Sequence, residues 1–204
     1  MGAAIFKEMA WLLRSADTSV RQNAVPKVVI FGFMNSGKTS LLSKMVQQSR
    51  KMDLIESKSF ENRLGLIESS PTIGFNVEEI GEPDNVLFHC WEISGFSSQT
   101  EQWQSYLDNT EFNMLIYVID IDEKDENNVE KNEQFITSLK EHPSLKNKPI
   151  VCVLNKIDLN SKQSFSKYLH IEKEYKVIKT SCKTGIGIQE LLNWVYHKSS
   201  HVHT

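Results

Sequence analysis

The chain alternates between short, continuous apolar runs and longer stretches in which apolar residues recur every three or four positions. Continuous runs rich in β-branched residues are typical of strands buried on both faces, and the periodic stretches are typical of helices. Strands that alternate with helices predict an α/β fold with a doubly wound, mostly parallel sheet. The predicted strands lie at 26–32, 114–119, 150–154 and 175–180, and the helices at 40–50, within 94–109, at 127–141 and at 188–197.

Two further strands are joined differently. Residues 75–80 and 86–93 are rich in strand-forming residues, and the sequence Gly-Glu-Pro-Asp-Asn at 81–85 separates them. A short segment of this composition between two strands predicts a hairpin turn. The hairpin therefore adds an antiparallel pair to the four runs above, which makes the predicted sheet six-stranded.

Residues 2–14 predict a short amphipathic helix with Ile5, Met9 and Leu12 on one face. The segment is too short, and its charges are too central, for a signal peptide. Two interpretations stay open: the helix lies on a membrane surface, or it packs against a partner or its own domain. The predicted organisation is an N-terminal helix and linker at 1–25, a main domain at 26–198 with an insertion at about 51–69, and a tail at 199–204.

The composition narrows the possible partners and compartment. The 204 residues carry a net charge of -3 and show no basic face, which argues against a nucleic acid partner. No apolar run is long enough to cross a bilayer. The three cysteines, Cys90, Cys152 and Cys182, are odd in number and lack the spacing of a metal site. They indicate buried free thiols in a reducing, intracellular compartment.

The clearest functional pattern is G-x-x-x-x-G-K-[ST] at 32–39. It lies between an apolar strand and a helix, where such a loop wraps backbone N–H groups around a phosphate and the helix N-terminus points at it. Lys38 would reach the β- and γ-phosphates, and the Thr39 hydroxyl would ligate Mg²⁺. The predicted phosphate-binding residues are Asn35, Ser36, Gly37, Lys38, Thr39 and Ser40.

A second pattern, N-K-x-D, follows the strand at 150–154. The carboxyl ends of parallel strands are where ligands bind in α/β sheets. The Asp158 carboxylate can accept two N–H groups from guanine, which adenine does not offer, and the stem of Lys156 can cover the base. The predicted base-binding residues are Asn155, Lys156 and Asp158, with the later loop Ser181, Cys182 and Lys183 at the same edge.

In this order and spacing, the motifs resemble those of the small GTPases. The segment 71–78, Pro-Thr-Ile-Gly-Phe-Asn-Val-Glu, looks like switch I of the Arf/Arl family almost letter for letter. The resemblance covers nearly the whole chain, including the N-terminal helix with Gly2. It implies the P-loop small-GTPase fold, with GTP or GDP and Mg²⁺ as cofactors. The family's three aromatic residues that respond to the switch state match Phe75, Trp91 and Tyr106, and Trp103 matches the family as well.

The resemblance also implies conformational change. Thr72 would close on Mg²⁺ and the γ-phosphate when GTP is bound. The hairpin 75–93 would slide in register and release the N-terminal helix. The matched aromatic residues, Tyr106 included, would pack in the core and at its rim, with partner contact as their only site role. Gly2 would be a site of lipidation, but the myristoylation pattern wants Ser or Thr where this chain has Phe6. Whether Gly2 carries a lipid stays open.

The chain departs from the family pattern in switch II, where W-D-x-G-G-Q becomes Trp-Glu-Ile-Ser-Gly-Phe at 91–96. Glu92 replaces the Asp that holds Mg²⁺ through water, and ligation of the metal by Glu92, either through water or directly, stays open. Gly95 is retained, and its N–H could still meet the γ-phosphate. Phe96 replaces the Gln that orients the attacking water and can form no such hydrogen bond. Met34 replaces the usual Asp beside the γ-phosphate.

These residues predict an Arf-like protein that binds guanine nucleotide, holds GTP with impaired or absent hydrolysis, and acts through a protein partner at its switch regions and N-terminal helix. One alternative is a structural subunit that keeps GTP permanently within a larger assembly. Another is a membrane-trafficking switch whose partner supplies catalysis. The expected location is a cytoplasmic membrane surface or an organellar assembly. An ATP-using enzyme is disfavoured by the N-K-x-D pattern.

Overall fold

A computed structural model describes most of the main domain. The described residues are 25–50, 74–82, 85–95, 101–159, 168 and 170–199. The predicted N-terminal helix with Gly2, the insertion at about 51–69, Thr72 and Phe96 lie outside them. The expectations placed on those residues therefore stay predictions.

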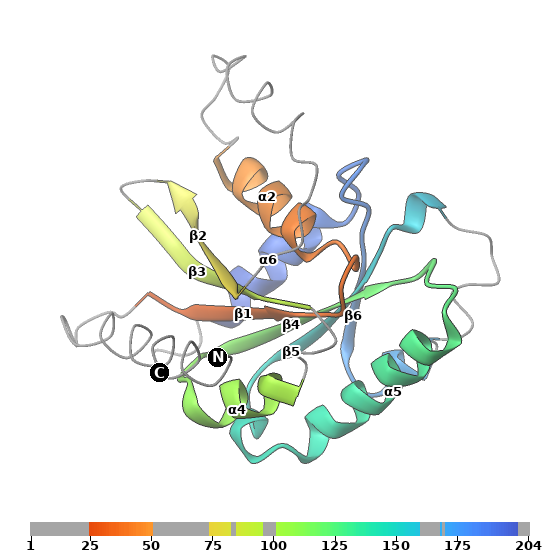
Figure 1. Ribbon diagram of the computed structural model, residues 1–204. Coiled ribbons are helices and arrows are strands. Elements are labelled where there is room, and N and C mark those ends of the chain that lie inside the picture. The colour runs from red at the N-terminus through yellow and green to blue at the C-terminus, as the bar shows by residue number, and fades with distance from the viewer. Residues whose placement is uncertain are drawn as a thin grey trace.

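The sheet is six-stranded, as the sequence predicts, and its strands run in the order β2-β3-β1-β4-β5-β6 (Figure 1). All neighbouring strands are parallel except β2 and β3, which form the predicted antiparallel hairpin. The strands are β1 (Lys27–Phe31), β2 (Phe75–Glu82), β3 (Asn85–Ile93), β4 (Met114–Asp120), β5 (Ile150–Asn155) and β6 (Lys176–Lys179).

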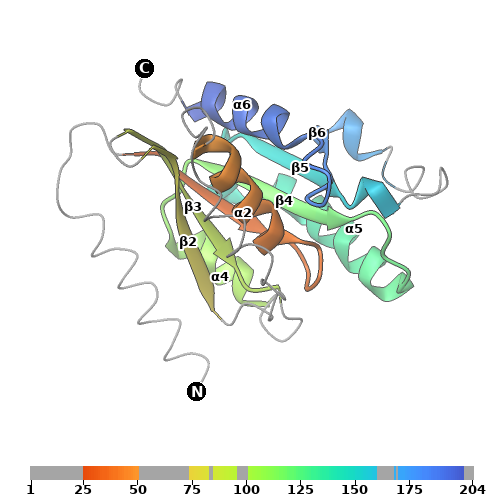
Figure 2. The ribbon, with the colours of Figure 1, turned by 90° about the horizontal axis from the view of Figure 1, so that it is seen from above.

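Helices cover both faces of the sheet, as Figures 1 and 2 show: α2 and α6 lie on one face, and α4 and α5 on the other. Because strand side chains alternate between faces, Val28 and Ile30 of β1 pack with α2, whereas Val29 and Phe31 pack with α4 and α5. In the described part of the chain, no helix is long and apolar enough to cross a membrane. The helices are α2 (Lys38–Ser49), α4 (Glu101–Asn109), α5 (Glu126–Glu141) and α6 (Ile188–Ser199).

The hairpin differs from the sequence expectation in its turn. Gly81 pairs with Val86, and Glu82 pairs with Asn85, so the strands extend into the segment 81–85 that was expected to be turn. The register shifts between Ile80 and Gly81, where Gly81 adopts a φ of 125°. Backbone pairing across the two strands therefore continues past the bulge and shortens the turn.

An aromatic cluster holds α4 against β1 and the loop that follows it. Trp103 is fully buried, and its ring lies 5.2 Å from Phe31, 5.3 Å from Phe33 and 4.8 Å from Phe135 between centroids. Its indole Nε1 donates a hydrogen bond to the Ser94 carbonyl at 2.9 Å. Trp103 therefore links the segment after β3 to the segment after β1, the two segments in which nucleotide contacts are expected.

We predict that Trp103→Phe lowers the free energy of unfolding by about 2–3 kcal/mol, because it leaves a cavity and removes the donor to a buried carbonyl. Trp194→Phe, at a partly buried position on α6, is the matched control and should cost about 1 kcal/mol or less. Urea unfolding followed by circular dichroism measures both. Equal losses in the two variants would contradict the role given to the indole N–H.

Candidate functional site

The loop between β1 and α2 has the backbone shape of a phosphate cradle. Asn35 and Gly37 adopt positive φ angles of 64° and 89°, which turn the chain sharply before α2 begins at Lys38. A Cβ atom at Gly37 would lie 2.3 Å from Nδ2 of Asn155, so only glycine fits there. The first N–H groups of a helix have no partner within the helix, so this loop presents donors to an anion.

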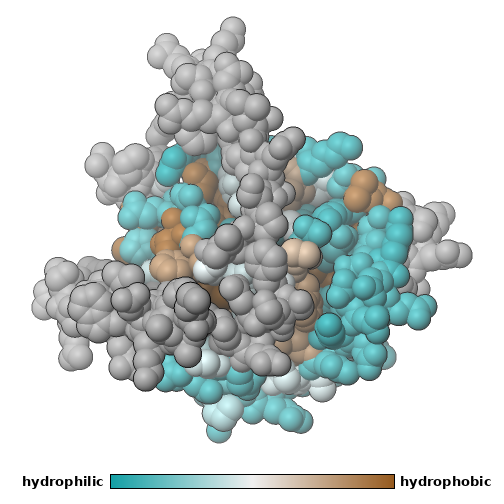
Figure 3. All heavy atoms as spheres, in the orientation of Figure 1, coloured by the Kyte–Doolittle hydropathy of each residue, from teal (hydrophilic) through white to brown (hydrophobic). Residues whose placement is uncertain are grey.

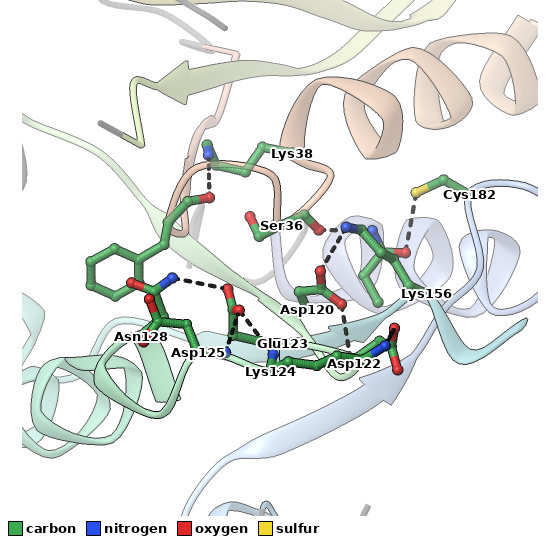
Figure 4. A network of polar contacts seen from close by, with 12 residues as sticks. Ser36, Lys38, Asp120, Asp122, Glu123, Lys124, Asp125, Asn128, Lys156 and Cys182 are labelled. Carbon is green, nitrogen blue, oxygen red and sulfur yellow. Dashed lines mark hydrogen bonds and ion pairs between the residues drawn. The ribbon is translucent and has the colours of Figure 1, made fainter. Parts of the chain in front are cut away.

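Lys38 crosses over this loop (Figure 4). Its side chain is largely buried, and its Nζ donates a hydrogen bond to the Phe33 carbonyl at 3.0 Å. Burial lowers the pKa of Lys38 from 10.5 to about 8, and the attraction of Glu92 opposes that shift. At neutral pH the ammonium therefore stays mainly charged and lies above the cradle.

Gly95 lies directly against the cradle. Its carbonyl accepts a hydrogen bond from the N–H of Met34 at 2.8 Å. A Cβ atom at Gly95 would come within 2.5 Å of Lys38 Nζ and 2.7 Å of Met34 N. The Met34 side chain is 45% exposed, so a thioether stands at the mouth of the site where the Arf/Arl pattern has a carboxylate.

Thr39 and Glu92 form the oxygen-rich end of the site. The Thr39 hydroxyl donates to Glu92 Oε1 at 2.5 Å, and Glu92 is only 1% exposed. A hydroxyl that gives its proton to a carboxylate keeps its lone pairs for a cation, and Mg²⁺ prefers oxygen ligands. The described residues contain no cluster of three or more His, Cys, Asp and Glu that could hold a metal by itself. The pair fits a Mg²⁺ ion whose remaining ligands are phosphate and water.

Asn155 ties the phosphate end of the site to the base end. It is buried at the end of β5, and its Nδ2 donates to the Ser36 carbonyl at 2.9 Å. Its Oδ1 accepts from Thr180 Oγ1 at 3.1 Å and from Cys182 Sγ at 3.3 Å. With both ends of its amide engaged, Asn155 acts as a brace between three loops.

The other base-end residues lie at the same edge of the sheet. Lys156 adopts a φ of 67°, and its Nζ forms an ion pair with Asp120 Oδ2 at 2.6 Å (Figure 4). Asp158 is exposed, and its Oδ1 accepts from Ser181 Oγ at 2.6 Å. These contacts fix the direction of the Lys156 stem and of the exposed Asp158 carboxylate, the two groups that are expected to contact a guanine base.

Several expectations need correction or addition. Cys182 is only half-buried, although burial still raises the pKa of its thiol to about 11. Tyr106 is 2% exposed and packs edge-on against Phe31, so it is not available to a partner in this conformation. Asp120 is not among the predicted site residues, yet Asp120 ends a buried strand at the ligand-binding edge, and that position could have indicated it.

Ser40, near the phosphate cradle, and Lys183, in the base loop, are both exposed.

Phe75 and Trp91, two aromatic residues that match the family pattern, lie close to each other. Phe75 and Trp91 stack across the hairpin with centroids 5.5 Å apart, and Lys27 Nζ lies 5.1 Å from the centre of the Trp91 ring. The backbone N–H of Ser94 donates to the Gly74 carbonyl at 2.9 Å, which joins the two ends of the hairpin. Away from this hairpin, the surface over α5 is mostly hydrophilic (Figure 3).

Comparisons with known proteins agree with this fold. A solved structure of translation elongation factor SelB from Methanococcus maripaludis, in complex with the GTP analogue GppNHp, matches with a TM-score of 0.56 at 17% identity. The match covers 88% of this chain and 34% of that one, and it shows the fold alone.

Curated relatives match over nearly their whole length. ADP-ribosylation factor 3 of Arabidopsis thaliana is 28% identical over 195 residues, which cover 92% of this chain and 95% of the relative. ADP-ribosylation factor-like protein 1 of Drosophila melanogaster is 25% identical over 177 residues, covering 83% and 86%. The model of the ADP-ribosylation factor family matches residues 13–199. The chain belongs to the ADP-ribosylation factor family.

Proposed function

We propose that this GTP-binding protein of the ADP-ribosylation factor family holds GTP with Mg²⁺ and hydrolyses it very slowly. The observation that carries the proposal is the contact between Gly95 and Met34, whose backbone atoms bond at 2.8 Å. It places the start of switch II against the phosphate cradle, where the next residue in the sequence is Phe96. Two apolar side chains, those of Met34 and Phe96, would then lie beside the terminal phosphate.

The chemistry of hydrolysis explains why these residues matter. The attacking water needs a group that accepts or donates a hydrogen bond to orient it in line with the leaving phosphate. Phenylalanine has no such group, and the thioether of Met34 is only a weak acceptor. Losing a positioning group of this kind costs on the order of a hundredfold in rate. Nucleotide binding is separate from hydrolysis in this proposal, because Lys38, Thr39 and Asp158 retain the groups that binding needs.

A protein that keeps GTP would act by presenting one conformation to a partner. In this proposal the partner binds the switch regions and the N-terminal helix at 1–25, at a membrane surface or within an organellar assembly. The stack of Phe75 on Trp91 supplies an apolar contact in the hairpin between the switches. A permanent structural subunit and a switch with partner-supplied catalysis are the two forms that this role can take. Lipidation of Gly2 would strengthen membrane attachment.

The nucleotide carried by the native protein tests the proposal directly. We expect freshly isolated protein, once denatured, to release GTP in about stoichiometric amount, because slow hydrolysis lets the triphosphate persist. Chromatography of the released nucleotide is the measurement. Stoichiometric GDP would contradict slow hydrolysis, and the absence of any nucleotide after supplying GTP and Mg²⁺ would contradict binding itself.

Restoring the polar groups should restore hydrolysis. We predict that the double variant Met34→Asp, Phe96→Gln hydrolyses GTP on the order of a hundredfold faster than the natural chain in a single-turnover assay. Ile186→Gln changes an exposed apolar residue in a loop after β6 and should leave the rate unchanged. A natural chain that already hydrolyses GTP at the rate of an active family member, measured in parallel, would refute the assignment.

Nucleotide affinity should fall as the pH rises through 8. Free protein has a Lys38 pKa of about 8, and bound phosphate raises that pKa, so binding takes up a proton above this pH. Between pH 7 and 8.5 we expect affinity for GDP to weaken about fourfold. Calorimetry at pH 8.5 in buffers of different ionisation enthalpy should detect the proton uptake. Equal affinities at both pH values, with no proton uptake, would show that Lys38 does not titrate there.

A further inference from the structure

The carboxylate of Glu92 lies beside the Thr39 hydroxyl, so a cation bound to Thr39 would also be close to Glu92. It pairs with Ile30 in the parallel register between β1 and β3. Phe88 and Cys90, at alternate positions of the same strand, are buried with residues of α2 and α6, so the side chain of Glu92 leaves the sheet on the α2 side. Its Oε1 accepts from Thr39 Oγ1 at 2.5 Å, at the first turn of α2.

The carboxylate of Glu92 is buried beside the Thr39 hydroxyl. At 1% exposure the carboxylate has lost nearly all contact with solvent, and a buried carboxylate needs cations or several donors around it. Lys38 supplies an attractive charge, but its Nζ is directed to the Phe33 carbonyl at 3.0 Å. A divalent cation bound at Thr39 would supply a closer and larger compensating charge.

The length of the side chain decides how Glu92 would meet that cation. In the Arf/Arl pattern the residue here is Asp, which reaches Mg²⁺ through a water. Removing the water brings the carboxylate oxygen about 2 Å nearer to the ion, because the direct Mg²⁺–oxygen distance is about 2.1 Å, whereas a water bridge, bent at the water oxygen, places the carboxylate oxygen about 4 Å from the ion. The extra methylene of Glu92 supplies about 1.5 Å of reach. Glutamate therefore covers most of the gap without movement of β3.

We propose that Glu92 binds the divalent cation directly and takes the place of one of its water ligands. This inference rests on the proposed nucleotide function, because phosphate completes the metal site. Mg²⁺ is commonly held by one or two carboxylates together with substrate phosphates, so the donor set is a usual one. Direct ligation leaves one water fewer around the ion and adds a negative charge to its coordination shell.

Counting the waters on the metal tests this directly. The full-length protein is loaded with GDP and Mn²⁺, and the electron paramagnetic resonance spectrum is recorded in ordinary and ¹⁷O-enriched water, since ¹⁷O broadens the lines for each bound water. We expect the natural chain to hold one water fewer than Glu92→Asp, which has the shorter side chain. An equal number of waters in the two proteins would overturn direct ligation.

Affinity for Mn²⁺ gives a second, independent readout. Glu92→Gln keeps the shape of the side chain but not its charge, and it should weaken Mn²⁺ binding to the GDP complex at least about tenfold. Glu79→Asp is the matched control: Glu79 is exposed on β2 beside His89, and its shortening should change neither readout. Normal GDP binding with unchanged Mn²⁺ affinity in Glu92→Gln would overturn this inference alone, whereas failure of the natural chain to bind GDP with Mn²⁺ would overturn the proposed function with it.

Discussion

The burial of two opposite charges, Lys38 and Glu92, is the constraint around which the site is arranged. Each would be costly in the interior if left alone, and together with Thr39 they reduce that cost only in part. The lowered pKa of Lys38 shows that the cost of burying its charge is larger than the attraction of Glu92. A ligand that brings phosphate to the lysine and a metal ion to the carboxylate would relieve both. The arrangement of these side chains thus favours a ligand that combines phosphate with a metal ion.

A second constraint concerns distance, because a nucleotide spans a phosphate end and a base end that come from different parts of the chain. The amide of Asn155 links the loop at 32–39 with the loops after β5 and β6 by three hydrogen bonds. Lys156 and Asp158 flank that brace. Displacement of one end of the site would therefore be transmitted to the other through a single side chain, which makes Asn155 a structural residue of the site more than a ligand.

Much of the fold could be predicted from the sequence because its strands are either continuous apolar runs or a hairpin with turn residues. The residues Lys38, Thr39 and Asp158 could be located for the same reason, since their motifs follow strands directly. The turn at 81–85 was misjudged because cross-strand pairing at Gly81 and Glu82 outweighs the turn propensity of the residues. Neither the ion pair of Lys156 with Asp120 nor the burial of Tyr106 could be predicted, because both depend on side chains that are distant in sequence.

Switch II departs from the family pattern at Glu92, at Ser94, which stands where the pattern has its first glycine, and at Phe96, and the surroundings of Ser94 set it apart from the other two. Its hydrogen bonds with Trp103 and Gly74 are made by its own carbonyl and N–H, and its φ is not among the positive values that favour glycine. Serine can therefore stand where the family has glycine without disturbing those contacts. The serine side chain at position 94 leaves these backbone contacts intact, whereas Glu92 and Phe96 alter groups that would face the metal and the attacking water. The departures in this short segment are therefore of two kinds, one that the backbone tolerates and one that changes the chemistry of the site.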